Sequence, residues 1–292
     1  GIWGYRGEGN NTIADCAVDN IDISGMDRIG GICGIAHYVN TIEECSISNS
    51  SITADNNIGN VGLIAGANLG NATDGPAILL NNTADVTTKE NFTLEGQVIE
   101  NPPILGANIN TGAPAQAAII GDVTRNEAGE IVDGTISVVG TEKDSIDVSS
   151  KLDLADGLAF YPNSDGTIGV DEAGYVAAIG DTRYTSFENA QAAVKPGETI
   201  TILTDITEET VSMNGFGIAS WNNSTLTATG NITATAGKNV LSGNVESAQL
   251  MLTGSKDEDR TLTITESANV DLYIKGRLDD GLLDVGKGLS GD

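Results

Sequence analysis

The sequence predicts an all-β protein built as a parallel β-helix, or β-solenoid. The first observation is a repeat: the segment that begins T-I-A-D-C at Thr12 recurs as T-I-E-E-C at Thr41. The second is the alternation of apolar and polar residues in short runs separated by Asn, Asp and Gly, which is typical of strands joined by corners. The third is the composition of the 292-residue chain, with 37 Gly and 4% aromatic residues. This composition favours a core built from layers of small and β-branched side chains.

The repeat has two halves, in which residues of the same kind recur at spacings of 29 and 32. The pairs are Ile13 with Ile42, Cys16 with Cys45, Val18 with Ile47, Ile23 with Ile52, Ile29 with Val61 and Gly34 with Gly66. One unit of this length cannot bury its apolar face alone, so neighbouring copies must stack. A weaker third copy begins at Ile78, and we expect Val86 to take the place of Ile52 at a spacing of 34. The longer spacing indicates a loop lengthened at one corner.

The Gly-rich halves, I-G-G-I-C-G and V-G-L-I-A-G, each accompany a segment that contains Cys. Together these segments resemble the GLUG repeat of bacterial surface proteins, over about residues 1–90. The third copy departs from that pattern, because it lacks Cys and has fewer glycines. The resemblance implies a domain of GLUG-like β-solenoid repeats at residues 1–90, of the kind that forms adhesive or spacer regions in large extracellular proteins.

Residues 91–174 are expected to form a β-rich connector with hairpins. Short strands are predicted at residues 92–94 and 98–99, and Pro102-Pro103 interrupts them. Apolar residues also alternate over residues 131–139 and 146–154. The sequences N-E-A-G at Asn126 and N-S-D-G at Asn163 are turn signals between strand pairs.

A second β-helix, preceded by a short capping helix near residues 185–195, is expected in residues 175–292. Thr185 to Glu188 is a T-x-x-E capping box, and Pro196-Gly197 ends the helix before a strand at residues 199–203. Helical spacing places four residues on one face: Phe187, Ala190, Gln191 and Val194. A helix in this position would cover the first open strand layer.

Strand-sized apolar runs follow the helix to the end of the chain. They are centred on Val211, Leu226, Ile232, Val240, Leu250, Leu262, Val270 and Leu283. The run A-x-x-A-V-x-P-G-E-T-I-T-I also resembles the opening of the pectate-lyase-like group. This resemblance implies that the β-helix is right-handed and parallel.

The charge of the chain excludes some classes of partner. With 14 Lys and Arg against 41 Asp and Glu, the formal net charge is −27. Such a protein repels nucleic acid and anionic lipid surfaces, so neither is expected as a partner. No apolar run approaches the ~20 residues that a membrane-spanning helix needs. We expect a piece of a longer extracellular, cell-surface protein whose export signal and anchor lie outside this segment.

The cysteines offer a disulfide. Stacked strands lie about 4.8 Å apart, so Cys16 and Cys45 at equivalent positions would come within reach of a disulfide. An extracellular location would permit the bond. The alternative is that inward cysteines stack as small apolar thiols, and Cys33 has no obvious partner in either case.

A calcium site is a further candidate, at Tyr161 to Glu172. The spacing of Asn163, Asp165 and Glu172 follows that of an EF-hand loop. However, Tyr161 occupies the first ligand position, and neither flank has helical periodicity. We therefore favour a hairpin turn, with calcium as the alternative and no other cofactor expected.

No catalytic residue is predicted. His37 is the sole histidine, and no nucleophile motif accompanies it. A sugar-cleaving site needs two carboxylates facing one groove, and no spacing brings the charged residues of the C-terminal half together. Those charged residues are Glu246, Glu266, Asp271, Arg260, Lys275 and Arg277, with Trp221 and Tyr273 as the nearest aromatic platforms.

The sequence therefore predicts a non-enzymatic, extracellular β-solenoid segment of a bacterial surface protein. It would act as an adhesin or spacer that presents loops to host or cell-wall glycans or to surface proteins. One alternative is a β-helix polysaccharide lyase or glycoside hydrolase. Another is a self-assembling component of a surface layer or fibre. The sequence does not specify an oligomeric state.

Overall fold

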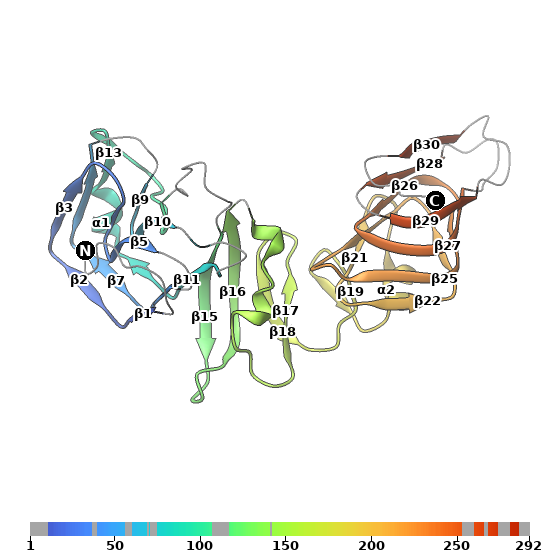
Figure 1. Ribbon diagram of the computed structural model, residues 1–292, viewed down its shortest axis with the longest axis horizontal. Helices are drawn as coiled ribbons and strands as arrows, with labels where there is room; N and C mark the ends of the chain where they lie inside the picture. Colours follow the sequence, from blue (N-terminus) through green and yellow to red (C-terminus); the bar gives the residue numbers. More distant parts are fainter. Residues whose placement is uncertain are drawn as a thin grey trace. The chain divides into compact units, whose positions relative to one another are not determined.

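The computed structural model describes residues 11–36, 40–55, 60–68, 70, 75–106, 117–140, 142–252, 260–265, 268–273 and 281–285. The chain is all-β, and the described residues contain only two short α-helices. It divides into two compact units (Figure 1). Unit 1 comprises residues 1–160 and 166–171, and unit 2 comprises residues 161–165 and 172–292. None of the helices among the described residues is long and apolar enough to cross a membrane.

The first two copies of the repeat each form five short strands in unit 1. The first copy contains β1 (Asn11–Ala14), β2 (Ala17–Asp19), β3 (Asp22–Gly25), β4 (Ile29–Gly30) and β5 (Cys33–Ala36). The second contains β6 (Asn40–Glu43), β7 (Ser46–Ser48), β8 (Ser51–Ala54), β9 (Val61–Gly62) and β10 (Ala65–Asn68). Each strand of the first copy pairs in parallel with its counterpart in the second.

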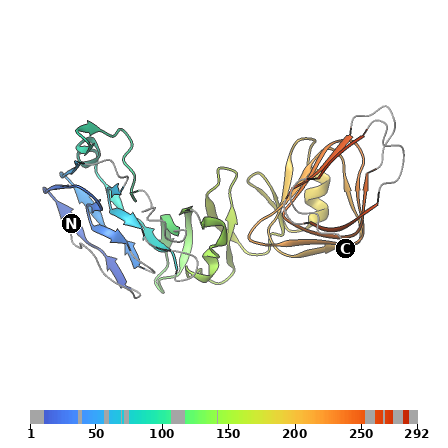
Figure 2. The same cartoon turned by 45° about the horizontal axis from the view of Figure 1, so that its top comes forward.

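The predicted register of these two copies is confirmed. Ile13 pairs with Ile42, Val18 with Ile47 and Ile23 with Ile52, all at a spacing of 29. In the Gly-rich half, Ile29 pairs with Val61 at a spacing of 32. The stacked strands run side by side from blue to cyan in Figure 2. The side chains of Ile42, Ile47 and Ile52 are buried, so the aliphatic positions form the core as expected.

The third copy exists, but after its first two strands its register differs from the predicted one. It begins with β11 (Ala77–Leu80) and β12 (Thr83–Ala84), and after helix α1 (Val86–Glu90) continues with β13 (Phe92–Leu94) and the short β14 (Gln97–Val98). Ile52 pairs with Phe92 at a spacing of 40, and not with Val86. Val86 instead starts α1 and is 69% exposed. The predicted lengthened corner is this helix, whose N-terminus Asp85 caps by accepting a hydrogen bond from Thr88 N.

The Gly-rich half also has a third copy, which the sequence did not reveal. Gly31 N donates to Leu63 O at 3.0 Å, and Leu63 N donates to Pro103 O at 2.8 Å. Residues 103–106 thus continue the stack, and Pro103 does not interrupt it. Proline has no N–H to donate onward. Position 103 therefore cannot donate a backbone hydrogen bond to a further layer.

Glycines of the motif are required by close backbone approach. A Cβ atom on Gly30 would collide with the backbone of Cys33 and of Gly66. One on Gly62 would collide with the backbone of Ala65 and of Gly106. These collisions lie within one copy and between neighbouring copies, so the glycines allow the tight turn and the stacking at the same time.

The end of unit 1 is a hairpin of two long antiparallel strands, β15 (Ala117–Arg125) and β16 (Ile131–Gly140). β15 also pairs in parallel with β11, which joins the hairpin to the stacked copies. The strand expected at residues 146–154 is wrong: 3₁₀-turns occupy Lys143–Ser145 and Val148–Ser150 instead. Ile146, Val148 and Leu152 are buried there, so their alternation reflects packing of a turn-rich segment. Strands β17 (Leu158–Pro162) and β18 (Ile168–Glu172) complete this sheet.

Unit 2 begins with β19 (Ala177–Ile179), β20 (Thr182–Tyr184) and helix α2 (Phe187–Ala193). The predicted helix is confirmed, but its N-cap is Ser186, whose hydroxyl accepts from Asn189 N, and not Thr185. Phe187 and Ala190 are buried in the core of the unit, as expected. In Figure 2, α2 lies within the outline of the surrounding strands. The helix thus covers the apolar interior next to β19 and β20.

The remaining strands of unit 2 form two mainly parallel sheets. They are β21 (Thr199–Ile202), β22 (Ile206–Glu208), β23 (Val211–Met213), β24 (Gly217–Ser220), β25 (Thr225–Ala234), β26 (Gly237–Ser242), β27 (Asn244–Leu252), β28 (Arg260–Thr265), β29 (Ala268–Tyr273) and β30 (Gly281–Val285). All eight predicted apolar runs lie in these strands. One sheet has the order β20-β19-β21-β24-β26-β28-β30 and the other β22-β25-β27-β29. Ile200, Ile218, Leu241 and Leu262 from the first sheet and Leu226, Ile232 and Leu250 from the second share one core.

Candidate functional site

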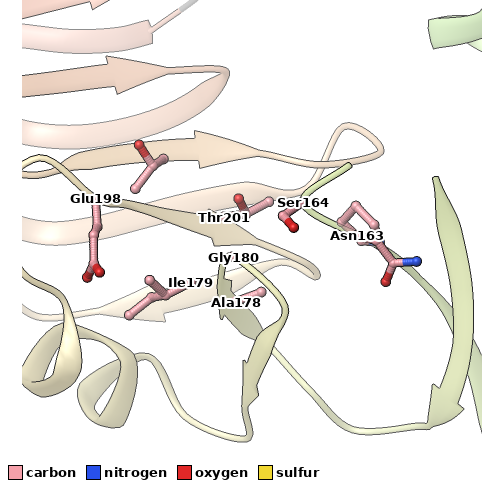
Figure 3. Close-up of a pocket in the computed structure, with 9 residues that line it drawn as sticks. Asn163, Ser164, Ala178, Ile179, Gly180, Glu198 and Thr201 are labelled. Atoms are coloured by element: carbon pink, nitrogen blue, oxygen red, sulfur yellow. The ribbon is translucent and has the colours of Figure 1, made fainter. Parts of the chain in front are cut away.

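An open pocket of about 360 Å³ lies on the outer surface of unit 2. Strands β19 and β21 and the tip of the β17–β18 hairpin form it, and Figure 3 shows the side chains that line it. Its lining residues are Pro162, Asn163, Ser164, Ala178, Ile179, Gly180, Glu198, Thr199 and Thr201. The lining is therefore rich in small, hydroxyl-bearing and amide side chains, with one carboxylate.

The floor of the pocket is the outer face of β19 and β21. Ala178 pairs with Thr201 across these antiparallel strands. Successive residues of a strand point to opposite faces. Their neighbours Ile200 and Ile202 are buried in the core, so Ala178 and Thr201 face outward. Because these outward side chains are small, they leave the pocket open above the strands.

Gly217 leaves room for the side chain of Thr199, which lines the pocket. These two residues pair across β21 and β24. A Cβ atom on Gly217 would lie 2.7 Å from the Thr199 hydroxyl oxygen, which is closer than van der Waals contact allows. Glycine at this position therefore lets Thr199 keep its position at the edge of the pocket.

Asp181 holds the hairpin tip against the floor. Ser164 donates from its backbone N to Asp181 Oδ1 at 2.7 Å and from its hydroxyl to Asp181 Oδ2 at 2.8 Å. These two bonds lower the pKa of Asp181 below its ordinary value. The carboxylate is consequently ionised at neutral pH and accepts hydrogen bonds from both the backbone N–H and the hydroxyl of Ser164.

A second contact fixes the hairpin tip through Arg183. Its Nη2 donates to Asn163 Oδ1 at 2.9 Å, and its guanidinium carbon lies 5.3 Å from the ring centroid of Tyr161. That ring is buried and meets Tyr175 edge-on at 5.6 Å between centroids. Tyr161 Oη accepts a hydrogen bond from Tyr175 N at 3.2 Å. The wall of the pocket is thus built on a packed aromatic and cationic base.

Glu198 stands at the rim, beside the end of α2. Its Oε2 accepts a hydrogen bond from Lys195 N at 2.8 Å, which orders the turn between α2 and β21. In Figure 3 the amide of Asn163 points away from the side chains of Ser164 and Thr201. The pocket can therefore offer hydroxyl groups and a carboxylate oxygen to a ligand.

No family model matches the chain, and no curated protein or solved structure proves significantly similar to it.

The calcium candidates lie at the hairpin itself. Asn163 and Asp165 belong to the turn between β17 and β18, and Glu172 is the last residue of β18. The turn is of the kind favoured by Gly, with Gly166 at φ +85°. Asn163 uses its side-chain oxygen for Arg183. Across the described ranges, no group of three or more His, Cys, Asp and Glu residues is arranged to hold a metal ion. Calcium binding stays a prediction.

Cys16 and Cys45 lie at equivalent positions of the first two copies and are free thiols, as is Cys33. The Cys45 thiol lies 3.2 Å from Glu43 O and 3.6 Å from Ile13 O of the preceding copy, and it lies against Cys16. Burial raises the pKa of Cys45. The disulfide between the two copies stays a prediction, which peptide mapping without reducing agent would test.

In the third copy, Asn82 stands where Cys45 stands in the second. Its Nδ2 donates to Ile42 O at 2.7 Å, and its Oδ1 accepts from Cys45 N at 3.1 Å. Ile42 is the counterpart of Ile13, so the Asn82 amide and the Cys45 thiol approach equivalent carbonyls, each in the preceding copy. Asn82 therefore makes, from the third copy, the contact with the preceding copy that the Cys45 thiol approaches from the second.

The charged residues considered for sugar cleavage lie on different elements. Glu246 is exposed on β27 and Asp271 lies on β29, whereas Arg260 lies on β28 of the other sheet. Trp221 is half-buried in the turn after β24, and Tyr273 ends β29. Glu266, Lys275, Arg277 and His37 lie outside the described residues.

Sequence reasoning missed the pocket. Its floor and its wall come from segments that are separated by the β18 strand and the turn after it. The signals in the sequence were the hairpin sequence N-S-D-G at Asn163 and the charged residues Asp181 and Arg183, which lie in the β19–β20 turn and in β20. The turn residues predict both loops, but they do not predict that the Asp181 carboxylate of one loop accepts hydrogen bonds from Ser164 of the other.

Proposed function

We propose that both units are right-handed parallel β-helices and that the chain is a non-enzymatic, ligand-presenting segment of a bacterial cell-surface protein. The observation that carries this proposal is the in-register parallel stacking of the repeat at spacings of 29 and 32 residues. A solenoid of this kind needs only nearest-neighbour contacts, so copies can be added to make a long support.

Hydrogen bonds between copies support a role as a stiff spacer. At the corner after β6, Glu44 N donates to Leu80 O at 3.0 Å, and at the corner after β11, Asn81 N donates to Gly121 O at 2.9 Å. The backbone ladder therefore continues through the corners as well as along the strands. Continuous ladders resist bending because every layer is tied to the next at many points.

Polar columns on the outside of unit 1 support a role in presenting a surface to partners. Ser48 donates to Asp19 at 2.7 Å and Ser51 to Asp22 at 2.5 Å, each pair linking neighbouring copies. Thr93 continues the pattern with a 3.1 Å bond to Thr53. Hydrogen bonds from Asn49 and Ser48 lower the pKa of Asp19, which keeps this column charged. The ordered hydroxyls and carboxylates match the hydrogen-bonding groups of glycans and of polar protein surfaces.

The location we propose is extracellular, on the cell surface. The formal net charge of −27 would keep an exposed protein soluble and would limit non-specific association with nucleic acid. The partners we propose are host or cell-wall glycans or surface proteins, as for an adhesin.

A binding assay paired with a turnover assay tests this function. The purified chain is applied to a glycan array and is incubated with pectins and other polyuronides, with and without calcium. We expect binding to at least one glycan class with no release of unsaturated or reducing products. Product release would contradict the proposal and favour the lyase or hydrolase alternative. Concentration-dependent filaments in electron micrographs would instead favour the fibre alternative.

A further inference from the structure

We propose that the pocket on β19 and β21 binds one neutral, pyranose-sized sugar unit. This inference rests on the proposed function, because it assigns a ligand class to a surface of a glycan-binding segment. It goes beyond that function by naming the place, the size and the charge of the ligand.

The size of the pocket favours a single ring. Ligand pockets in proteins run from about 300 to 1,000 Å³, and this one, at about 360 Å³, lies near the lower limit. Its open mouth would let the rest of a glycan chain continue into solvent. A long oligosaccharide groove would need a longer row of lining residues than two strands and a hairpin tip provide.

The side chains that line the pocket favour a ligand that donates hydrogen bonds. The Ser164 hydroxyl already donates to Asp181 Oδ2, so toward the pocket it acts as an acceptor. Glu198 is an acceptor when ionised, and Lys195 N occupies only its Oε2. Thr199 and Thr201 add hydroxyls that can accept or donate. A sugar ring supplies several hydroxyl donors on one face.

The apolar part of the lining suits the other face of the same ring. Pro162, Ala178 and Ile179 contribute carbon atoms, and Pro162 and Ile179 are partly exposed. The C–H groups of a pyranose can cover such a surface, which removes apolar area from water. The lining contains no aromatic ring, so stacking adds nothing and we expect weak, millimolar affinity.

Charge then separates neutral sugars from acidic ones. Glu198 lines the pocket, and Asp181 lies behind Ser164 with a lowered pKa. A uronate carboxylate in the pocket would meet the Glu198 carboxylate at the rim, whereas the Arg183 guanidinium at the base of the wall interacts with Asn163, Tyr161 and Asp181. We therefore expect the matched uronic acid to bind at least tenfold more weakly than its neutral parent.

The test is a two-dimensional amide NMR titration of the whole chain. Glucose, galactose, mannose and N-acetylglucosamine are each titrated, with glucuronate and galacturonate as charged counterparts. We expect at least one neutral sugar to shift the amides of Gly180, Thr199 and Thr201. The inference is overturned if none of the four sugars shifts these amides, or if the uronates shift them equally well.

Two variants and one control locate the site. Thr201→Tyr fills the pocket and should abolish the shifts, whereas Thr227→Tyr, on the outer face of β25, should leave them unchanged. Thr201→Val keeps the shape and removes the hydroxyl, so it should weaken binding at least threefold without changing the melting temperature. Shifts that persist in Thr201→Tyr would place the sugar elsewhere and overturn the inference.

The glycan array separates failure of the pocket assignment from failure of the general function. If Thr201→Tyr still binds on the glycan array, the general function stands and the pocket assignment fails. If the unmodified chain binds no glycan on the array, the general function fails as well.

Discussion

Single residues at the corners of unit 1 adopt a backbone conformation that most side chains disfavour. Asp15, Glu44 and Asn81 follow β1, β6 and β11, and their φ angles are 53°, 53° and 55°. Asn20 and Asn49 occupy a second corner with φ angles of 55° and 47°. Asn and Asp tolerate this left-handed region, because their short polar side chains bond locally. Glu44 has a longer side chain, so it is the strained residue among the three equivalent corner positions.

Glu44 provides a prediction on stability. Glycine reaches a positive φ without a Cβ clash, so Glu44→Gly should be more stable than Glu44→Ala by about 1 kcal/mol. Urea unfolding followed by circular dichroism measures the difference. At Glu43, which lies in a regular strand, the order should reverse, with Ala more stable than Gly. Equal stabilities of the two Glu44 variants would mean that this corner is not left-handed.

Asn239 is a buried amide that links three layers of unit 2. Its Oδ1 accepts from Gly215 N at 2.8 Å, and its Nδ2 lies 3.2 Å from Thr261 O and 3.1 Å from Ala236 O. Asn239→Ala leaves these backbone groups buried without a partner, at a cost of about 2–4 kcal/mol. Gln249→Ala removes an exposed amide from β27 and should cost less than about 0.5 kcal/mol. Thermal and urea unfolding of both variants would reveal the difference, and similar losses would contradict the account.

Cys33 provides a prediction on reactivity and pH. Burial raises the pKa of this thiol to about 11, and its hydrogen bond to Ile35 O only partly opposes the shift. Only the thiolate reacts with iodoacetamide, so Cys33 should be alkylated more slowly in the folded protein than in the urea-unfolded protein. Between pH 8 and pH 10 its rate should still rise about tenfold per pH unit. Mass spectrometry of timed samples gives these rates, and a plateau below pH 9 would show that the thiol is not buried.

At the scale of elements, strand pairing could be predicted from the sequence where the same residue types recur at a fixed spacing. The first two copies share Ile, Cys and Gly at fixed spacings, and those spacings fix which residues pair. The prediction failed at Val86, because an inserted helix moves the register by more residues than the pattern shows. It failed at residues 146–154, because a turn-rich segment buries Ile146, Val148 and Leu152, whose spacings of two and four residues mimic strand alternation. The Ser186 cap and the Thr185 cap differ by one residue, within the usual uncertainty of a helix start.

The hairpin tip held by Asp181 is an element whose stability should depend on pH. A carboxylate with a lowered pKa stabilises the structure above the ordinary pKa of Asp and loses this effect as pH falls through the lowered value. Hydrogen exchange of the Ser164 amide should therefore be protected at neutral pH and lose protection only in acid. Asp181→Ala should remove the protection at neutral pH, whereas Asp156→Ala, at an exposed position, should not. Unchanged protection in Asp181→Ala would show that other contacts hold the tip.

The candidate site depends on contacts between elements that no local pattern announces. The floor could be anticipated in part, since Thr199 and Thr201 alternate with the buried Ile200 and Ile202 in a predicted strand. The wall could not, because it needs Ser164 to reach Asp181 across 17 positions of chain. Long-range bonds between two turns depend on the fold as a whole, so the sequence predicts each turn but not the bond between them.

For the molecule as a whole, one physical rule accounts for both units. Each layer is too small to bury its apolar side chains, so successive layers stack in parallel and share one interior. In unit 1 the layers repeat in sequence, and the repeat made the stacking predictable. In unit 2 the layers differ in sequence, with Thr199 paired to Gly217 and Gly217 to Val240 at spacings of 18 and 23. There, strand positions could be predicted but not their partners.

The most direct test of the stacked-repeat account is a cross-link between outward positions of neighbouring copies. Asp19 and Ser48 pair across β2 and β7 at a spacing of 29 and are both accessible. In a background with the three native cysteines replaced by Ser, Asp19→Cys with Ser48→Cys should be joined rapidly by a short thiol cross-linker. The control pair, Asp19→Cys with Thr93→Cys, lies on the same unit but out of register and should not react under the same conditions. A folded protein that cross-links the control pair as fast as the in-register pair would contradict the stack and the function built on it.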